Sequence, residues 1–371
     1  MVGGFLGAGK TTAIAALAKR FSDDGRRVGL ITNDQGQGLV DTQMLRSRGF
    51  ATEEIAGGCF CCKFQSLVDA ARRLTSETRP DLFLAEPVGS CTDLVATVSY
   101  PLRRIYGEDY EMAPFSVLVD PTRARRMFGL EAGRGFSPKV EYIYRKQLEE
   151  ADIIVISKRD LLSVKDLEEL TDALGNEFPQ ARVLSLSSRT GEGFEEWMET
   201  LRDGTQPSRA AMQVDYDTYA EGEALLGWLN ATLSVTYTGK EEGETSPMLE
   251  ELMKRVQREL QQREIEIAHL KMTLSPEVAF AGEVAVINLV RTDAAPEFGQ
   301  ELDEPVDRGE IILNLRAEGA PEVIEELVRG AVAESALGWV LQFEHLECFQ
   351  PGRPVPTHRD DGIPPASGCS I

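Results

Sequence analysis

The chain has 371 residues, a formal net charge of −22 at pH 7, and a composition of 42% hydrophobic and 27% charged residues. Its length allows two domains with a sizeable core. So negative a charge argues against a nucleic-acid partner, which requires a basic surface. No apolar run approaches the ~20 residues of a membrane span, and no secretory signal precedes the first motif. We therefore expect a cytoplasmic protein with no membrane partner.

The first motif begins at the fourth residue and reads Gly-Phe-Leu-Gly-Ala-Gly-Lys-Thr-Thr. Gly4, Gly9, Lys10 and Thr11 have the spacing of a phosphate-binding loop, and a helical run follows over 12–21. Glycines let the backbone bring successive N–H groups to phosphate oxygens, and the helix N-terminus favours the same anion. Lys10 should contact the β and γ phosphates, and the Thr11 hydroxyl should ligate Mg²⁺. The predicted phosphate site comprises Gly7, Ala8, Gly9, Lys10, Thr11 and Thr12.

Apolar runs that end in polar residues alternate with helical stretches through the first 200 residues or so. We expect strands at 27–32, 81–86, 115–120, 153–158 and 182–186, and helices near 66–77, 140–150, 164–174 and 193–202. This alternation predicts an α/β domain, a parallel sheet with helices on both faces and a ligand at the carboxyl ends of the strands. Only three residues precede the phosphate loop, so we expect the first strand to be incomplete in the chain as given. The same edge should gather Asn33, Asp34, Glu86, Asp120 and the loop at Lys158.

The loop after the strand at 153–158 reads Ser-Lys-Arg-Asp and resembles the Asn-Lys-x-Asp base-recognition loop of GTPases. The Asp160 carboxylate can accept two hydrogen bonds from the N1 and N2 groups of guanine, and the stem of Lys158 can pack along the base. Ser157 replaces the usual Asn, which weakens one orienting contact. The pattern predicts GTP and GDP as the nucleotides.

The second distinctive stretch is Gly-Gly-Cys-Phe-Cys-Cys at 57–62, which holds three of the six cysteines. If the segment is extended, Cys59 and Cys61 point to one side, and Cys62 follows within reach after a small turn. Thiolates suit Zn²⁺, Cu(I) and other borderline or soft ions better than Mg²⁺, and three ligands leave a tetrahedral ion one open position. The alternative interpretations are a trio of inert buried cysteines and a vicinal redox pair.

Together the motifs resemble the metal-homeostasis GTPases of the CobW, HypB and UreG type, and most of all the CobW-like cobalamin-synthesis branch. The resemblance rests on residues 3–12, 57–62, 85–89 and 157–160. It implies that Glu86 lies by the γ-phosphate, where it holds Mg²⁺ through water or orients the attacking water, and that Asp41 in the first switch region is a second Mg²⁺-side ligand. It also implies that the cysteine block binds Zn²⁺ or Co²⁺ between the two switches. No arginine finger is evident in cis, so intrinsic hydrolysis should be slow.

After a GTPase domain over 1–203 and a polar linker over 204–222, we expect a smaller α+β domain over 223–350 and an irregular tail over 351–371. Strands are expected at 233–237, 266–274, 283–292, 310–317 and 339–349, with helices at 246–264 and 321–335. Ser246 should cap the first of these helices. This order predicts a ferredoxin-like domain with an extra strand. His269, His345 and the tail residues His358 and Cys369 are expected to have no ligand role.

The leading hypothesis is a GTP-hydrolysing metal chaperone for Zn²⁺ or Co²⁺, with Lys10 and Glu86 as catalytic residues and Cys59, Cys61 and Cys62 as ligands. Its partners would be guanine nucleotide, a transition metal, a client metalloprotein or cobalamin-pathway protein and, as one option, a second copy of the chain in a homodimer. One alternative is a regulatory G-protein that remodels a corrinoid- or metal-dependent client and has a structural cysteine block. A small-metabolite kinase would leave the loop at 157–160 without a purpose.

Overall fold

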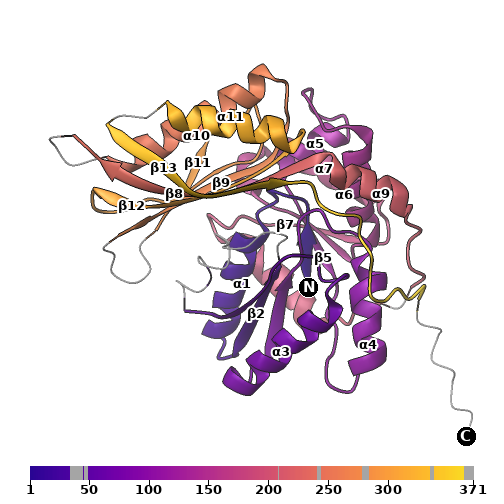
Figure 1. Ribbon diagram of the computed structural model, residues 1–371. Helices are drawn as coiled ribbons and strands as arrows, with labels where there is room; N and C mark the ends of the chain where they lie inside the picture. The colour runs from indigo at the N-terminus through magenta and orange to yellow at the C-terminus, as the bar shows by residue number, and fades with distance from the viewer. Residues whose placement is uncertain are drawn as a thin grey trace, which may run out of the picture. The chain divides into compact units, whose positions relative to one another are not determined.

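The computed structural model describes residues 1–33, 45, 49–207, 209–239, 244–277, 284–334 and 338–362. The chain forms two compact units (Figure 1). The described residues of 1–33, 50–220 and 353–362 belong to the first unit, and those of 221–352 belong to the second. No helix in the described ranges combines the length and hydropathy that a membrane span requires.

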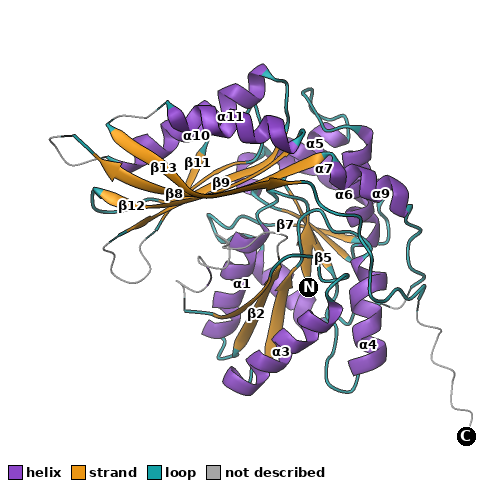
Figure 2. Cartoon of the chain, viewed as in Figure 1, coloured by secondary structure: helices purple, strands orange, loops and turns teal. Residues whose placement is uncertain are grey.

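Parallel strands form the centre of the first unit (Figure 2). They are β1 (Val2–Gly4), β2 (Val28–Asn33), β3 (Ala51–Ile55), β4 (Leu82–Glu86), β5 (Ser116–Val119), β6 (Ile153–Ile156) and β7 (Arg182–Ser185). One sheet has the order β3-β2-β4 and the other the order β1-β5-β6-β7, with β4 and β1 as neighbours between them. The predicted parallel sheet is confirmed. The edge strand β3 escaped prediction because its two central residues are acidic and only Thr52 and Ile55 are buried.

Helices flank these strands. They are α1 (Lys10–Asp23), α3 (Phe64–Thr78), α4 (Tyr100–Tyr106), α5 (Pro121–Met127), α6 (Pro138–Glu150), α7 (Val164–Glu177), α8 (Phe194–Asp203) and α9 (Tyr216–Ala224), with a π-helical turn at Val95–Ser99 and a 3₁₀ turn at Arg159–Leu161. In Figure 1, α1 and α3 lie on opposite sides of β2. Both faces of the sheet are therefore covered, and the loops at the carboxyl ends of its strands carry the polar residues.

The second unit is a six-stranded antiparallel sheet with two helices on one face (Figure 1). Its elements are β8 (Leu226–Tyr237), α10 (Thr245–Gln262), β9 (Ile267–Pro276), β10 (Ala285–Leu289), β11 (Glu297–Gln300), β12 (Arg308–Glu318), α11 (Pro321–Ala333) and β13 (Trp339–Phe349). The strand order is β11-β10-β9-β12-β8-β13. Without the β10–β11 hairpin this is a ferredoxin-like order, so the predicted α+β architecture is confirmed.

Two details of the second unit differ from prediction. The strand expected at 233–237 begins at Leu226, because apolar Trp228 and Leu229 continue the buried run upstream. Helix α10 begins at Thr245, so Ser246 is not its cap. The Ser246 hydroxyl instead donates to Glu301 Oε2 at 2.7 Å, which removes it from competition for backbone N–H groups.

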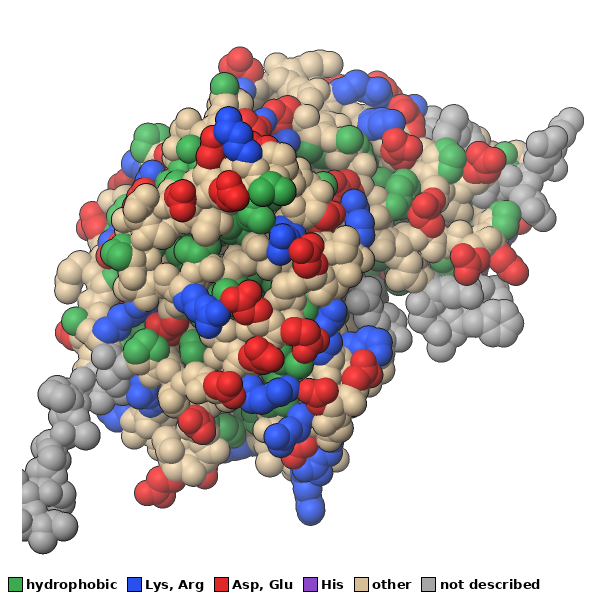
Figure 3. Space-filling view, turned by 180° about the vertical axis from the view of Figure 1, so that it is seen from behind, with side chains coloured by type: hydrophobic (Ala, Val, Ile, Leu, Met, Phe, Trp, Pro, Cys, Tyr) green, Lys and Arg blue, Asp and Glu red, His purple; other side chains and the backbone are tan. Residues whose placement is uncertain are grey.

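The surface carries charges of both signs. On the face drawn in Figure 3, acidic and basic side chains are interspersed. Exposed ion pairs of the protein include Arg202–Asp24 at 2.7 Å and Arg27–Asp81 at 2.8 Å. Such exposed pairs contribute little stability each, and their interspersion keeps the excess of negative charge from collecting in one patch on this face.

Candidate nucleotide and metal site

The phosphate loop joins β1 to α1. At Gly4, φ is +130°, and a Cβ atom there would lie 2.3 Å from the carbonyl oxygen of Leu118 in β5, so only glycine fits. Helix α1 begins at Lys10, which leaves the N–H groups of its first turn to face an anion. Lys10 Nζ donates to the carbonyl oxygen of Phe5 at 3.3 Å. This geometry places the lysine ammonium on the loop itself, as phosphate binding requires.

Thr11 and Glu86 meet beside this loop. The Thr11 hydroxyl donates to Glu86 Oε1 at 3.0 Å, and both residues are buried, at 7% exposure. One comes from the first turn of α1 and the other from the last residue of β4. A hydroxyl and a carboxylate are hard oxygen ligands, the kind that Mg²⁺ prefers. The residues present therefore fit a magnesium ion next to the phosphates.

Asp120 follows β5 at the same edge. Its Oδ1 accepts the N–H of Arg123 at 3.0 Å, which caps α5, and its Oδ2 pairs with Lys158 Nζ at 3.0 Å. Burial alone would raise the pKa of Asp120, but the charges of Lys158 and Arg123 outweigh it and lower that pKa. Lys158 has a left-handed backbone, with φ +49°. The ion pair thus fixes the loop after β6 to the end of β5.

Hydrogen bonds and an ion pair hold the predicted base-recognition loop in place. The hydroxyl of Ser157, which stands where Asn is usual, donates to the carbonyl oxygen of Val119 at 2.9 Å. The Asp160 carboxylate pairs with Arg189 at 3.4 Å. Ser187 Oγ accepts the N–H groups of Arg189 at 3.2 Å and Thr190 at 3.1 Å. The two loops that would surround a base are thereby joined through Asp160, whose role in base recognition stays a prediction.

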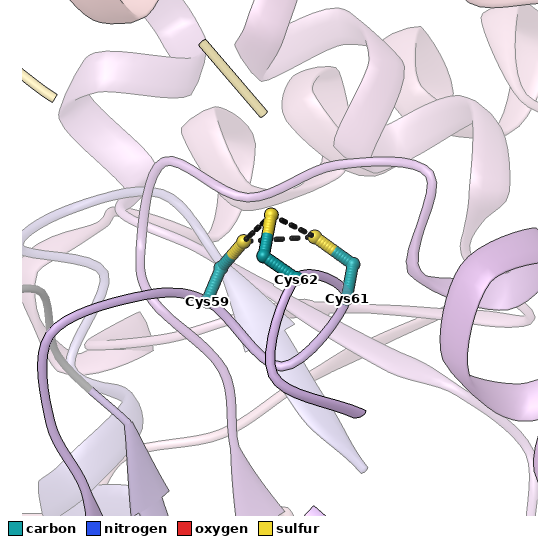
Figure 4. A group of neighbouring side chains, drawn as sticks. All are labelled: Cys59, Cys61 and Cys62. Atoms are coloured by element: carbon teal, nitrogen blue, oxygen red, sulfur yellow. Dashed lines mark hydrogen bonds between the residues drawn. The ribbon is translucent and has the colours of Figure 1, made fainter. Parts of the chain in front are cut away.

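The cysteine block forms a compact turn, so the extended segment assumed from the sequence is wrong. The N–H groups of Cys62 and Lys63 both donate to the carbonyl oxygen of Cys59, at 3.1 and 2.9 Å. This turn brings the three sulfur atoms together (Figure 4). Cys59 Sγ lies 2.8 Å from Cys61 Sγ and 3.1 Å from Cys62 Sγ, and Cys61 Sγ lies 3.7 Å from Cys62 Sγ. A tetrahedral ion bound by these three sulfurs would separate them by about 3.8 Å, so a small expansion of the trio admits one.

The three thiols share negative charge unequally. Hydrogen bonds with the side chains of Cys61, Cys62 and Cys91 lower the pKa of Cys59 well below the ordinary thiol range. The hydrogen bond with Cys59 raises the pKa of Cys62 to about 11, and hydrogen bonds together with burial raise that of Cys61. Because a metal ligates thiolates, loading this site would release the protons that Cys61 and Cys62 retain.

Asn33, the last residue of β2, anchors the cysteine block. Its amide nitrogen donates to the carbonyl oxygens of Ile55 at 2.8 Å and Gly58 at 2.7 Å, and its amide oxygen accepts the N–H of Phe60 at 2.9 Å. Asn33 is 8% exposed. The sequence predicts Asn33 at the edge of the sheet where the strands have their carboxyl ends. The structure adds that Asn33 is hydrogen-bonded to Gly58 and Phe60, the residues on either side of Cys59. The block is thus attached where the predicted first switch region begins. Asp34 and Asp41 of that region lie outside the described residues.

Residues 353–362, the C-terminal strap, cross the cysteine block. The Val355 N–H donates to Cys62 Sγ at 3.3 Å. The Thr357 N–H donates to the carbonyl oxygen of Cys61 at 2.9 Å, and its hydroxyl donates to that of Cys62 at 3.0 Å. The His358 ring packs edge-on against Phe64, with ring centroids 4.8 Å apart. The sequence carries no signal for this docking, because most of the contacts use backbone groups.

The strap continues along the first unit beyond His358. Arg359 Nε pairs with the buried Asp93 Oδ2 at 2.8 Å, and the Tyr216 hydroxyl donates to the same oxygen at 2.6 Å. Burial raises the pKa of Asp93 despite these two partners. The N–H of Asp360 donates to the carbonyl oxygen of Ala96 at 2.9 Å. The strap therefore reaches from the cysteine block to the segment that follows β4.

Two more residues that sequence reasoning missed support the site. Arg123 Nη1 donates to the carbonyl oxygen of Leu6 in the phosphate loop at 2.9 Å. Gln147 of α6 donates to the carbonyl oxygens of Gly89 and Cys91, both at 2.9 Å. Each is buried and polar within an amphipathic stretch, a pattern that predicts a specific partner but does not identify it.

The comparisons with known proteins include a family match that covers most of the first unit. Residues 1–185 match the family model described as CobW/HypB/UreG, nucleotide-binding domain. The chain is 28% identical over 211 residues to a zinc chaperone CobW of Sinorhizobium sp, covering 52% of this chain and 59% of that protein. It is 28% identical over 163 residues to the zinc chaperone YeiR of Escherichia coli K12, covering 43% and 46%. The chain thus spans about half the length of these curated relatives.

Among solved structures, the Zn(II)-bound YjiA GTPase from E. coli aligns over 91% of this chain and 98% of its own, at 15% sequence identity and a TM-score of 0.35. The hydrogenase maturation factor HypB from Archaeoglobus fulgidus aligns over 54% of this chain and 87% of its own, at 24% identity and a TM-score of 0.38.

Proposed function

Because its first 185 residues belong to the CobW/HypB/UreG family of nucleotide-binding domains, we propose that this chain is a GTP-hydrolysing metal chaperone. It would bind a transition metal, Zn²⁺ or Co²⁺, on Cys59, Cys61 and Cys62 and deliver it to a client metalloprotein. The names of the two curated relatives described above, both zinc chaperones, support a metal-handling role. The observation that carries the proposal is the convergence of three sulfur atoms, all within 4.8 Å of one another, on the unit that holds the phosphate loop.

In this proposal Lys10 holds the β and γ phosphates, and Glu86 orients the water that attacks the terminal phosphate. Mg²⁺, when bound at Thr11, would neutralise the charge that develops on the transferred phosphoryl group. The Asp160 carboxylate would select guanine, with Lys158 along the base. Replacing Glu86 by Ala should slow hydrolysis while leaving GDP binding mostly intact, since GDP lacks the terminal phosphate beside which Glu86 would act.

The cysteine trio is the cargo site in this proposal, and its donor set supports that role. Thiolates favour Zn²⁺ and Co²⁺ over the Mg²⁺ that serves the phosphates, so one chain can hold both kinds of ion without exchange. Three protein ligands leave a tetrahedral ion one open position, through which a client ligand can take it. The block is bonded to Asn33 at the end of β2, where the predicted first switch region starts, so movement of that region would reach the sulfurs.

The test is a Zn²⁺ and Co²⁺ titration of the full chain carrying Cys59→Ser with Cys61→Ser. We expect loss of tight binding, because only one cysteine of the trio remains, together with retained GTP binding. Cys348→Ser in β13 of the second unit is the matched control and should bind like the parent. Unchanged metal affinity in the double variant would contradict the chaperone role. It would favour the alternative, a regulatory G-protein that remodels a client and whose cysteine block is structural.

A further inference from the structure

Cys91 is a fourth thiol beside the cysteine trio, on the segment that follows Glu86. Resting on the proposed function, we propose that Cys91 is the fourth ligand of the transported ion while the terminal phosphate is bound, and that it withdraws after hydrolysis. The ion would alternate between a closed four-thiolate site and an open three-thiolate site. The ligand class is a borderline divalent cation, Zn²⁺ or Co²⁺.

The first support is the contact of Cys91 with the trio. Its side chain is hydrogen-bonded to that of Cys59, which is itself hydrogen-bonded to both Cys61 and Cys62. Cys91 is buried, at 1% exposure. The thiol therefore touches one corner of the trio, while the other three sulfurs converge on one another. A small displacement toward the trio would complete a tetrahedron.

The second support is the close packing of the same segment on the phosphate loop. At Gly89, a Cβ atom would lie 3.0 Å from Lys10 Nζ and 3.0 Å from the backbone nitrogen of Leu6. The phosphate loop thus meets this segment at Gly89, and Ser90, fully buried, is the single residue between that meeting point and Cys91. A phosphate held by Lys10 would therefore act on the backbone two residues from the fourth thiol.

The third support is the way the turn is held. The N–H of Cys91 donates to the carbonyl oxygen of Val88 at 3.0 Å, and Gln147 binds the carbonyl oxygens of Gly89 and Cys91 together. These bonds join the two ends of the turn from Val88 to Cys91, so we expect the ends to move together. When the terminal phosphate fixes Gly89, Cys91 stays against Cys59. After hydrolysis the turn is released, and the ion loses one of four ligands.

An inert buried cysteine is the alternative interpretation, because free cysteine is among the most buried residue types. An inert thiol would pack against apolar side chains, whereas the side chain of Cys91 is hydrogen-bonded to Cys59, the thiol that contacts both other members of the trio. A closed four-sulfur site holds an ion, and an open three-sulfur site can pass it on. Binding of the fourth ligand would hold the ion during transport, and loss of that ligand would allow its release.

The experiment uses the full chain with Co²⁺ as the probe and compares a non-hydrolysable GTP analogue with GDP. The sulfur-to-cobalt charge-transfer absorbance follows the number of Co–S bonds. In the parent it should be higher with the GTP analogue than with GDP. In Cys91→Ser it should fall by about a quarter with the analogue, one Co–S bond in four, and stay unchanged with GDP. Cys91→Ala should behave like Cys91→Ser, and Cys348→Ser should behave like the parent.

Zn²⁺ competition with a chelator provides the affinity. With the GTP analogue, Cys91→Ser should weaken Zn²⁺ binding at least as much as loss of a residue that only supports a ligand, roughly 10–100-fold. With GDP it should leave the affinity unchanged. X-ray absorption at the zinc edge of the parent needs no variant and should give four sulfur neighbours with the analogue and three with GDP.

The outcomes separate this inference from the proposed function. If Cys59→Ser with Cys61→Ser abolishes Co²⁺ binding while Cys91→Ser matches the parent in both nucleotides, the chaperone role stands and the fourth ligand is refuted. Three sulfur neighbours of zinc in both nucleotide states would refute it equally. If the double variant still binds Co²⁺ tightly, the chaperone role itself fails.

Discussion

The phosphate loop and the cysteine block are two candidate binding sites of one unit, and they depend on remote residues to different extents. The phosphate loop is contiguous, and its glycine conformations and the helix that follows arise from residues 4–23. The cysteine block is contiguous too, but its position depends on Asn33, on the Cys91 segment and on the C-terminal strap. A site formed from its own backbone tolerates change elsewhere. A site held by remote residues responds to whatever moves them, which is what a carrier of metal requires.

The largest expected effect is on the local site. Lys10→Ala should lower GTP turnover by at least about 10²–10³-fold, because it removes the cation that stabilises the terminal phosphate. Phosphate release measures this. Lys19→Ala, an exposed lysine of the same helix paired with Asp23, is the control and should turn over like the parent. Zn²⁺ affinity without nucleotide should be the same in both variants, and a loss in Lys10→Ala would break the contrast between the two sites.

The next largest effect should come from loss of Asn33, which supports the cysteine block from the end of β2. Asn33→Ala leaves two carbonyl oxygens and one N–H without their partner, a cost of about 1–3 kcal/mol that should appear as roughly tenfold weaker Zn²⁺ binding. Competition with a fluorescent chelator measures it. Asn230→Ala, a buried asparagine of the second unit bonded to Glu347, controls for general loss of stability. Parental Zn²⁺ affinity in a folded Asn33→Ala protein would show that the block positions itself.

Loss of guanine recognition at Asp160 should change GTP affinity by as much as Asn33→Ala changes Zn²⁺ affinity, or by less. Asp160→Asn should weaken GTP binding by about 1–3 kcal/mol, because an amide cannot accept both guanine N–H groups. Calorimetric titration measures the affinity. Xanthosine triphosphate, which carries an oxygen at C2 in place of the amino group, should bind the variant better than GTP does. Equal GTP affinity in parent and variant would remove Asp160 from the base site.

The smallest effect should come from the C-terminal strap. Thr357→Val removes the hydroxyl bond to Cys62 and keeps the backbone bond to Cys61, so up to about 1 kcal/mol is lost. Zn²⁺ release to a chelator should become a few-fold faster, as followed by stopped flow. Thr238→Val breaks a similar exposed bond, to Gly338 in the second unit, and should leave release unchanged. Identical release in the two variants would mean that the strap does not restrain the block.

The sequence predicts the locally formed parts of this molecule better than the parts that remote residues hold in place. Strands such as Ile153–Ile156 are continuous apolar runs, and helices such as Pro321–Ala333 carry an apolar stripe, so most strands and helices of both units were predictable. The phosphate loop was equally readable because its chemistry requires a contiguous pattern. The turn of the cysteine block was not, since its own bonds join backbone groups, and the bonds that anchor it come from Asn33 and from strap residues nearly 300 positions away, as in the bond of Val355 to Cys62. Backbone donors leave no trace in residue identity.

We propose that the terminal phosphate and the sulfur ligands bias the same loops. The direct test is the Zn²⁺ dissociation constant of the full chain with a non-hydrolysable GTP analogue, with GDP and without nucleotide. We predict binding at least about tenfold tighter with the analogue than with GDP, and by linkage the same factor of increase in analogue affinity when Zn²⁺ is bound. Equal Zn²⁺ dissociation constants under all three conditions would contradict the claim and leave two independent sites on one unit.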